Sequence, residues 1–473
     1  MLNFDVLYLK EVDMNLELER KSIWQQIDDA ELKEINEYGE RYKDFLDKCK
    51  TERECVDFIE KKAIEHGYVS LDEAIKTPVK AGDKIFINFR NKAIALFLIG
   101  KECMTKGMNI VGSHIDVPRL DIKPTPIYED SELALMKTHY YGGVKKYQWP
   151  TIQLAMHGYV KTKDGKEINI VIGEDDNDPV FYITDLLPHL GKDQAKGTLA
   201  EGIPAESLNV VIGHSSYGIS EKENPIKKNI LKLIHDKYGI VEEDFISSEI
   251  EMVPQAKARD IGFDRAMIAA HGHDDRVCSY ANLEAILKLE EVETTAVSLF
   301  VDKEEIGSYG NASMSSAFFE NAVAEILASR GDFSDILTRR AMQNSKILSA
   351  DVSAAVDPDY KDVNDPHNAA LVGYGIGVTK YTGARGKGGC NDANPEFIAE
   401  IRKKFDDNGV IWQTCELGKA DQGGGGTIAA EIAKYGCEVL DCGTAMLSMH
   451  APVELVSKAD CYMTAKAYHA FLK

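Results

Sequence analysis

The N-terminal part of this 473-residue chain shows apolar positions at helical spacing, followed by short continuous apolar runs. Residues 21–66 place apolar side chains three or four positions apart, which predicts two or three amphipathic helices. The runs at 84–89, 93–100 and 108–113 predict strands, and Arg90-Asn91 predicts a turn that pairs the first two. A helical layer and the first strands of a sheet are therefore expected here.

The pattern changes between residues 125 and 258. Alternating apolar positions such as Ile168, Ile170 and Ile172 predict strands with one buried face, and Lys163-Asp164-Gly165 predicts a hairpin turn. A helix is predicted over 226–238. This block of about 130 residues has the size of a domain. We therefore predict an inserted β-rich domain at 125–258 and a discontinuous domain formed by 1–124 and 259–473.

Strand and helix patterns alternate again from residue 261 onward. Strands are predicted at 266–270, 296–300, 347–352, 375–381, 411–414 and 439–443. Such alternation predicts an α/β domain with a mostly parallel sheet flanked by helices. In these sheets, functional residues collect at the carboxyl ends of the strands.

Two adjacent carboxylates, Glu304 and Glu305, follow the run at 296–300. Neighbouring side chains on a strand point to opposite faces, but a bend at Gly307 allows both to reach one site. One carboxylate can then bind a metal while the other moves protons. Taken alone, the pair also fits a solvated acidic loop, because most Glu residues lie at protein surfaces.

The same rule about strand ends selects further residues as partners for this pair. They are two imidazoles and several carboxylates: His114, Asp275, Glu304, Glu305, Asp351 and His450. This set can bind two divalent metals, with one carboxylate bridging both ions. In the segment His114-Ile115-Asp116, the imidazole is expected to bind a metal and the carboxylate to orient the imidazole.

Composition excludes some classes of partner. Lysine and arginine number 55 against 77 aspartates and glutamates, and the resulting charge of −22 argues against nucleic acid or an anionic membrane as partner. No run of about 18 apolar residues predicts a membrane-spanning helix, and the start Met1–Asp5 shows no secretory signal. Nine scattered cysteines predict reduced thiols in a cytoplasmic protein.

Four motifs together resemble the M18 family of metallo-aminopeptidases, the aspartyl aminopeptidase family. They are Gly112-Ser113-His114-Ile115-Asp116-Val117-Pro118-Arg119-Leu120, Asp302-Lys303-Glu304-Glu305-Ile306-Gly307-Ser308, Ser349-Ala350-Asp351 and Ser448-Met449-His450. The resemblance covers nearly the whole chain. It implies a zinc-exopeptidase-like catalytic domain with an inserted dimerisation domain, which removes N-terminal residues from peptides with two metal ions, zinc or else cobalt or manganese. It also implies a homo-oligomer in which dimers assemble into a tetrahedral dodecamer.

The resemblance further implies a role for each residue of the site. Glu304 is the general base and Asp116 orients His114; the metal ligands are His114, Asp275 as the bridge, Glu305, Asp351 and His450. The family reads Arg-Leu-Asp-Asn around the bridging residue, whereas this chain reads His273-Asp274-Asp275-Arg276. Asp274 is therefore the alternative bridge, and the related M42 aminopeptidases are a neighbouring interpretation.

Three residues are candidates for binding substrate. By resemblance, His189 reaches from the inserted domain into a neighbouring subunit's site, and Lys380 lies where a cation would suit an acidic N-terminal side chain. Gly425 belongs to the run Gly423–Gly426, which either brings backbone close to substrate or forms a tight turn into a helix. Two other classes stay open: an amidohydrolase of the same fold, and a non-catalytic assembly protein, against which the presence of Glu304 argues.

Overall fold

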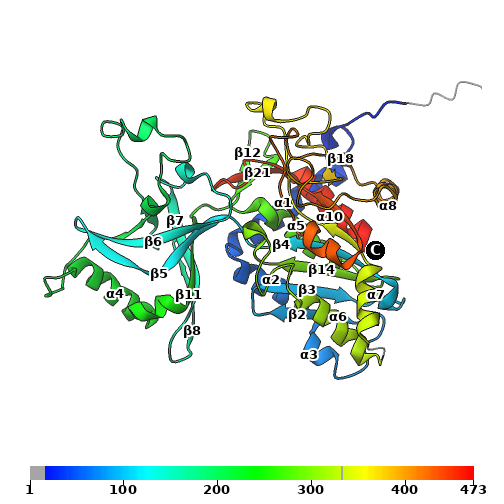
Figure 1. Ribbon diagram of the computed structural model, residues 1–473, viewed down its shortest axis with the longest axis horizontal. Coiled ribbons are helices and arrows are strands. Elements are labelled where there is room, and N and C mark those ends of the chain that lie inside the picture. The colour runs from blue at the N-terminus through cyan, green and yellow to red at the C-terminus, as the bar shows by residue number, and fades with distance from the viewer. Residues whose placement is uncertain (1–15, 332–333) are drawn as a thin grey trace, which may run out of the picture.

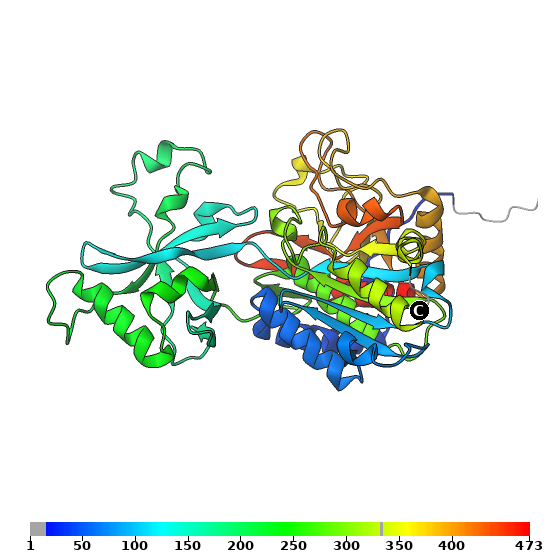
Figure 2. The same ribbon diagram turned by 60° about the horizontal axis from the view of Figure 1, so that its bottom comes forward.

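The computed structural model describes residues 16–331 and 334–473 and consists of two lobes joined by a narrow neck of strands (Figures 1 and 2). The segment Met1–Asp5, on which the prediction about a secretory signal rests, lies outside the described residues. In the described part of the chain, no helix is both long and apolar enough to cross a membrane.

The larger lobe is built on a sheet with the strand order β1-β2-β3-β14-β4-β15-β19-β17-β18. Its strands are β1 (Val69–Ser70), β2 (Lys84–Phe89), β3 (Ala93–Leu98), β14 (Thr295–Val301), β4 (Met108–His114), β15 (Lys346–Ser349), β19 (Glu438–Gly443), β17 (Ile376–Thr379) and β18 (Trp412–Thr414). The central strands β14, β4, β15 and β19 are parallel, whereas β3 and β17 join them antiparallel. The predicted parallel sheet is thus parallel at its centre and mixed at its flanks.

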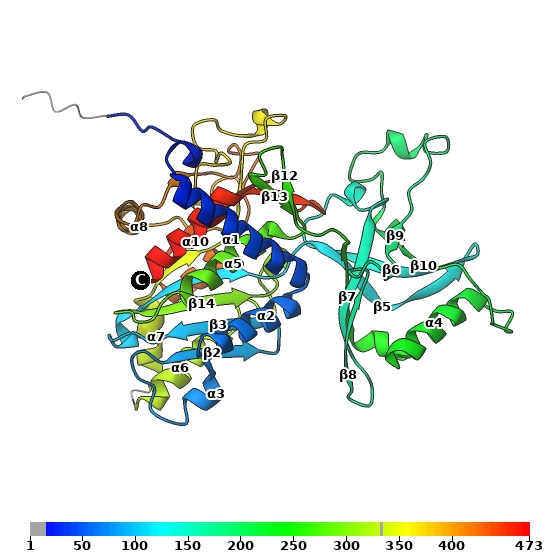
Figure 3. The same cartoon turned by 180° about the vertical axis from the view of Figure 1, so that it is seen from behind.

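Both faces of this sheet are covered by helices, and each face has its own apolar core. One face packs against α1 (Asp29–Lys48), α2 (Glu52–Glu65), α5 (His273–Leu287), α8 (Pro395–Asp407) and α10 (Lys458–Leu472), several of which cover the sheet in Figure 3. The other packs against α3 (Leu71–Ala74), α6 (Phe318–Ser329), α7 (Asp335–Gln343) and α9 (Ala429–Ile432). Strand alternation explains the division, because Leu96 and Leu98 enter the first core and Ala95 and Phe97 the second.

A third, smaller sheet lies beside the central one and corrects one expectation. Its strands are β12 (Arg259–Ile261), β13 (Met267–Ala270), β21 (Glu454–Ser457), β20 (Ala445–Leu447) and β16 (Ser353–Ala354), in that order. The predicted strand at 266–270 therefore does not join the mostly parallel sheet; it pairs antiparallel with β21 instead. An apolar pattern shows that a segment is a strand, but it does not name the partner strand.

The second lobe is an antiparallel sheet with the order β11-β5-β6-β10-β9-β7-β8, in which β11 also pairs with β7. Its strands are β5 (Arg119–Asp130), β6 (Leu133–Tyr141), β7 (Gln153–Lys161), β8 (Glu167–Ile172), β9 (Phe181–Ile183), β10 (Val210–Gly213) and β11 (Ser248–Pro254), and its helix is α4 (Pro225–Tyr238). It has a separate apolar core around Trp149 and Phe245. The sheet begins at Arg119, so the boundary predicted at residue 125 falls inside β5.

The two lobes meet at a buried histidine between two carboxylates. His157 of β7 has Nδ1 at 2.8 Å from Glu54 Oε1 of α2 and Nε2 at 3.1 Å from Glu174 Oε1. Burial by itself lowers the pKa of this imidazole, but its hydrogen bonds to Glu174 and Glu54 outweigh that effect and raise the pKa above the ordinary value. The protonated ring therefore links α2 of the larger lobe to β7 of the second lobe.

His157→Gln is expected to lower the free energy of unfolding by about 1–3 kcal/mol near pH 6, and by less near pH 9. The folded-state pKa of His157 is raised, so its contribution is fully present below the unfolded value near 6.5 and is lost as the pH rises through the folded value. Urea unfolding at both pH values measures this difference. His235→Gln, a change at an exposed histidine of α4, is the control, and an equal loss at both pH values would contradict the prediction.

Candidate metal centre

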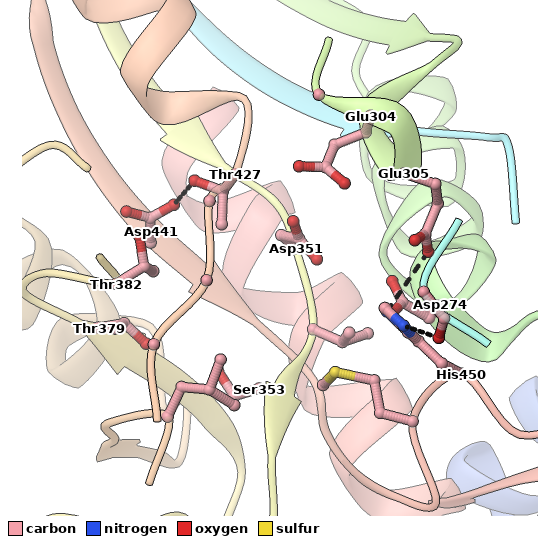
Figure 4. A pocket seen from close by; sticks show the side chains of 18 residues that line it. Asp274, Glu304, Glu305, Asp351, Ser353, Thr379, Thr382, Thr427, Asp441 and His450 are labelled. Atoms are coloured by element: carbon pink, nitrogen blue, oxygen red, sulfur yellow. Dashed lines mark hydrogen bonds and ion pairs between the residues drawn. The ribbon is translucent and has the colours of Figure 1, made fainter. Parts of the chain in front are cut away.

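A cavity of about 460 Å³ opens where the carboxyl edge of the central sheet meets the third sheet (Figure 4). It is lined by Gly143, Asp274, Glu304, Glu305, Gly307, Asp351, Val352, Ser353, Thr379, Thr382, Leu417, Gly424, Gly425, Gly426, Thr427, Asp441, Met449 and His450. The central sheet contributes residues that follow β14 and β15, whereas the third sheet contributes residues that follow β13 and β20. Residues from two different sheets therefore line the same cavity.

Two histidines belong to this site: His450 lines the cavity, and His114 is buried next to it, beside Asp274. His114 is the last residue of β4, and its Nδ1 donates to the carbonyl of Asp116 at 3.0 Å. His450 follows β20, and its Nδ1 donates to the carbonyl of Gly143 at 2.9 Å. A carbonyl only accepts, so each Nδ1 carries a proton, and in the neutral ring the lone pair is then on Nε2. Both rings are thus prepared to bind a cation through Nε2.

Asp274 lies between these two nitrogens. Its Oδ1 is 3.3 Å from His114 Nε2, and its Oδ2 is 3.1 Å from His450 Nε2. The backbone of Asp274 is extended (φ −80°, ψ 108°) although it stands near the start of α5. The structure therefore brings Asp274 to the position expected for a bridging carboxylate.

Asp275, the residue selected from the sequence as the bridge, is placed differently. Its side chain is fully buried, and neither carboxylate oxygen has a hydrogen-bond partner among the described residues. Burial raises the pKa of this carboxyl well above its ordinary range. It does not line the cavity. Neighbouring aspartates in a non-helical segment point in different directions, and their sequence does not show which one faces the site.

The two glutamates approach different histidines. They form the short 3-10 helix η7 (Glu304–Ile306) after β14, and the chain turns there with positive φ at Lys303 (69°) and Gly307 (97°). Glu304 Oε2 lies 4.0 Å from His114 Nε2, whereas Glu305 Oε1 lies 3.5 Å from His450 Nε2. The bend expected at Gly307 is present, and the pair points into one site (Figure 4).

Asp116 holds this turn in place. Its Oδ1 accepts the backbone N–H of Glu304 at 3.1 Å, and its Oδ2 accepts that of Glu305 at 3.2 Å. Oδ1 also lies 3.3 Å from His114 Nδ1. The residue predicted to orient His114 is therefore also bonded to both glutamates.

The donor set suits divalent metals. Asp351 follows β15, with Oδ1 at 3.8 Å from His114 Nε2. Two groups, His114 with Glu304 and Asp351, and His114 with Asp274 and Glu305, keep their possible ligand atoms within 4.8 Å of one another. Burial and the neighbouring Asp351 carboxylate raise the pKa of Glu304 to about 8, and Glu305 Oε1 is buried without a hydrogen bond in the described part of the chain. Imidazole and carboxylate ligands together are typical of zinc and similar ions.

Sequence reasoning missed Glu454, which fixes two of these residues. Its buried carboxylate accepts the backbone N–H of His450 at 2.6 Å and that of Asp274 at 3.1 Å. A carboxylate four residues after His450 was a visible signal. The carbonyl of Gly143 comes from the second lobe, and no residue type in the sequence marks it.

Gly425 lies in the wall of the cavity. Its neighbour Gly424 has φ 108°, and a Cβ at that position would stand 2.3 Å from the carbonyl oxygen of Gly383. Glycine in this run keeps the cavity wall free of side chains and allows the backbone to lie close to the loop that contains Gly383.

Lys380 and His189 do not line this cavity. Thr379 at the end of β17 faces it, and the side chain of Lys380 points elsewhere, to Asp392 and the carbonyl of Ala393. Strand alternation explains why the side chains of these two consecutive residues point in opposite directions. His189 is exposed on the second lobe.

The fold and the donor set define this protein as a metal-dependent hydrolase with an α/β core. Residues 45–472 match the family described as Aminopeptidase I zinc metalloprotease (M18), and the chain belongs to that family. It is a metallo-aminopeptidase, as the motif resemblance predicted.

Relatives of known sequence and structure cover almost the whole chain. The probable M18 family aminopeptidase 1 of Clostridium acetobutylicum is 50% identical over 456 residues, which cover 96% of this chain and 98% of the relative. The crystal structure of an M18 family aminopeptidase from Thermotoga maritima superposes with a TM-score of 0.93 at 44% identity, covering 97% of this chain and 100% of that chain. Aminopeptidase I of C. acetobutylicum superposes with a TM-score of 0.90 at 48% identity, with the same coverage of both chains.

Proposed function

We propose that this aminopeptidase hydrolyses the N-terminal peptide bond of peptides with two divalent metal ions, most naturally zinc, and a glutamate general base. The observation that carries the proposal is Asp274, whose two oxygens face Nε2 of His114 and Nε2 of His450. His114, Asp351 and Asp274 would hold one ion; His450, Glu305 and Asp274 would hold the other. Bound ions supply Lewis acidity, which activates water and polarises the scissile carbonyl.

Glu304 is assigned the proton transfer. Its carboxylate lines the cavity, but it lies farther from the imidazoles than Asp274 or Glu305 does. A carboxylate at that position can take a proton from the attacking water and deliver it to the leaving amine. The Asp116 carboxylate accepts hydrogen bonds from the backbone N–H groups of Glu304 and Glu305. These bonds fix the position of the proposed base relative to the proposed metal ligand.

The lining of the cavity supports a neutral N-terminal side chain. Apolar atoms of Val352, Leu417 and Met449 line it together with the hydroxyl groups of Ser353 and Thr382. Such a surface favours residues like leucine, alanine or methionine. Lys380, which the sequence suggested for acidic substrates, forms an ion pair with Asp392 instead.

The second lobe, which contains the predicted inserted segment 125–258, is proposed as a dimerisation domain. It has its own sheet and core, which supports its role as a separate unit. One structurally similar protein, yeast mApe1, is described as a dodecamer. We propose a dodecamer here too, built as a tetrahedral assembly of dimers, with His189 reaching a neighbouring subunit's site, in a cytoplasmic enzyme.

The function is tested by the release of free amino acids from short peptides with free or N-acetylated ends. Unblocked peptides are expected to lose their N-terminal residue, and leucyl substrates are expected to react at least about tenfold faster than aspartyl ones, because a carboxylate would be desolvated beside Asp441 without a matching cation. Chelation should abolish the activity, and zinc, cobalt or manganese should restore it. Preferred hydrolysis of N-acetylated substrates would favour the alternative, an amidohydrolase of the same fold.

A further inference from the structure

A buried network of charges connects the neck between the lobes to the turn that carries Glu304 and Glu305. It begins at Arg119, the first residue of β5, where the chain leaves the larger lobe. Arg119 is 5% exposed, and its Nε lies 2.9 Å from Asp121 Oδ1 and 3.2 Å from Glu251 Oε2. Glu251 belongs to β11, the strand by which the chain returns. One guanidinium therefore contacts both strands of the neck.

The first branch of the network runs through Tyr141. The Arg119 guanidinium stacks on the Tyr141 ring at 3.8 Å from its centroid. The Tyr141 hydroxyl donates to Asp116 Oδ2 at 2.8 Å, and Asp116 accepts the backbone N–H groups of Glu304 and Glu305. Three consecutive contacts thus lead from the neck to the backbone of the catalytic turn.

The segment after Tyr141 touches the metal centre directly. A Cβ on Gly142 would lie 3.1 Å from Glu305 Oε2, so this glycine packs against a proposed ligand. The carbonyl of Gly143 accepts from Nδ1 of His450. The position of Tyr141 therefore also determines where Gly142 packs against Glu305 and where the Gly143 carbonyl meets His450.

The second branch runs through ion pairs. Arg119 Nη1 lies 3.5 Å from Glu52 Oε2 at the start of α2, and Glu52 is paired with Lys92. Lys92 Nζ lies 3.6 Å from Asp302 Oδ2, at the first residue of the turn. Glu52 and Asp302 are buried, and a buried charge without its partner is strongly unfavourable. Both branches therefore end at residues 302–305.

We propose that Arg119 is a positioning residue that makes the geometry of the catalytic turn depend on how the second lobe is seated on the larger one. This inference rests on the proposed function for its kinetic readout. The structural part of the inference is independent of the proposed function, because the hydrogen bonds at the Glu304 and Glu305 amides exist whether or not a substrate reacts.

The test compares the intact holoenzyme with Arg119→Met, Arg119→Lys and Tyr141→Phe. Hydrogen exchange in a peptide spanning Asp302–Ser308 is expected to become about tenfold faster in Arg119→Met, with exchange in β19 unchanged. The kcat is expected to fall about tenfold while KM changes by less than about twofold, with metal content retained. Arg119→Lys should show an intermediate loss, because an ammonium keeps the charge but not the fork or the stacking surface.

Arg41→Met is the matched control. Arg41 of α1 pairs with Glu284 of α5 at 3.3 Å and lies over the Tyr38 ring, and neither partner belongs to the network. It should leave exchange at 302–308 and kcat unchanged. Equal effects of Arg41→Met and Arg119→Met would overturn the proposal, as would unchanged exchange and kcat in all three test variants. If Arg119→Met does not fold, Arg119→Lys and Tyr141→Phe decide the question. A wild-type protein without peptidase activity would refute the proposed function, whereas the exchange data would still test Arg119.

Discussion

Glu304→Gln is expected to lower kcat by about a thousandfold while both metal ions stay bound. The amide has the size of the carboxylate, but it accepts no proton from water. Glu304 is not needed to complete the proposed ligand sets of either ion, so its loss should leave metal content near that of the wild type. Metal analysis together with steady-state kinetics on an unblocked leucyl peptide measures both quantities.

The neighbouring residue provides the contrast. Glu305→Ala removes a carboxylate whose Oε1 lies 3.5 Å from His450 Nε2, and it should lose metal as well as activity. Glu400→Gln, which breaks only an exposed ion pair with Lys346, is the control and should change neither. A Glu304→Gln enzyme with a near-normal rate would show that another group moves the proton.

Asp274→Asn is expected to lower kcat/KM by at least about a hundredfold and to reduce metal occupancy, whereas Asp275→Asn should retain both ions. Asp274 is the carboxylate that faces both imidazoles, and an amide there offers one neutral oxygen in place of two charged ones. Metal content after dialysis, measured for the two variants side by side, distinguishes the aspartates. Both substitutions keep the shape of the side chain, so they form a matched pair.

The opposite result has an equally clear meaning. Loss of metal in Asp275→Asn, with retention in Asp274→Asn, would restore the assignment made from the sequence. Asp275 is fully buried and its oxygens have no hydrogen-bond partner among the described residues. Its replacement therefore tests the contribution of a buried side chain to packing. A fall in stability without loss of metal is therefore the expected effect of Asp275→Asn.

The second lobe also supplies contacts to the candidate metal centre. His450 is oriented by the carbonyl of Gly143, and Asp116 receives the hydroxyl of Tyr141. Both partners belong to the second lobe, at or just after β6. The contacts that orient His450 and Asp116 therefore depend on the packing of the two lobes.

The sequence alone determined the residue types and most of the strand ends. Apolar runs that end in His114, Glu304-Glu305 and Asp351 could be read because buried parallel strands are continuous apolar segments and their carboxyl ends share one edge. The helix at 226–238, the hairpin at Arg90-Asn91 and the family motifs could be read for similar local reasons.

Tertiary structure decided what depends on contacts between distant segments. Only the fold shows that β13 and β20 belong to a separate sheet, so that Asp274 and His450 reach the site from a different sheet than His114. Only the fold places Asp274, and not Asp275, in the lining of the cavity and turns the Lys380 side chain away from it. The fold also brings Glu454, Tyr141 and Arg119 together with the residues around the site. The physical reason is that side-chain periodicity reports burial along one element, whereas direction and partnership are set by the packing of elements that the chain brings together from far apart.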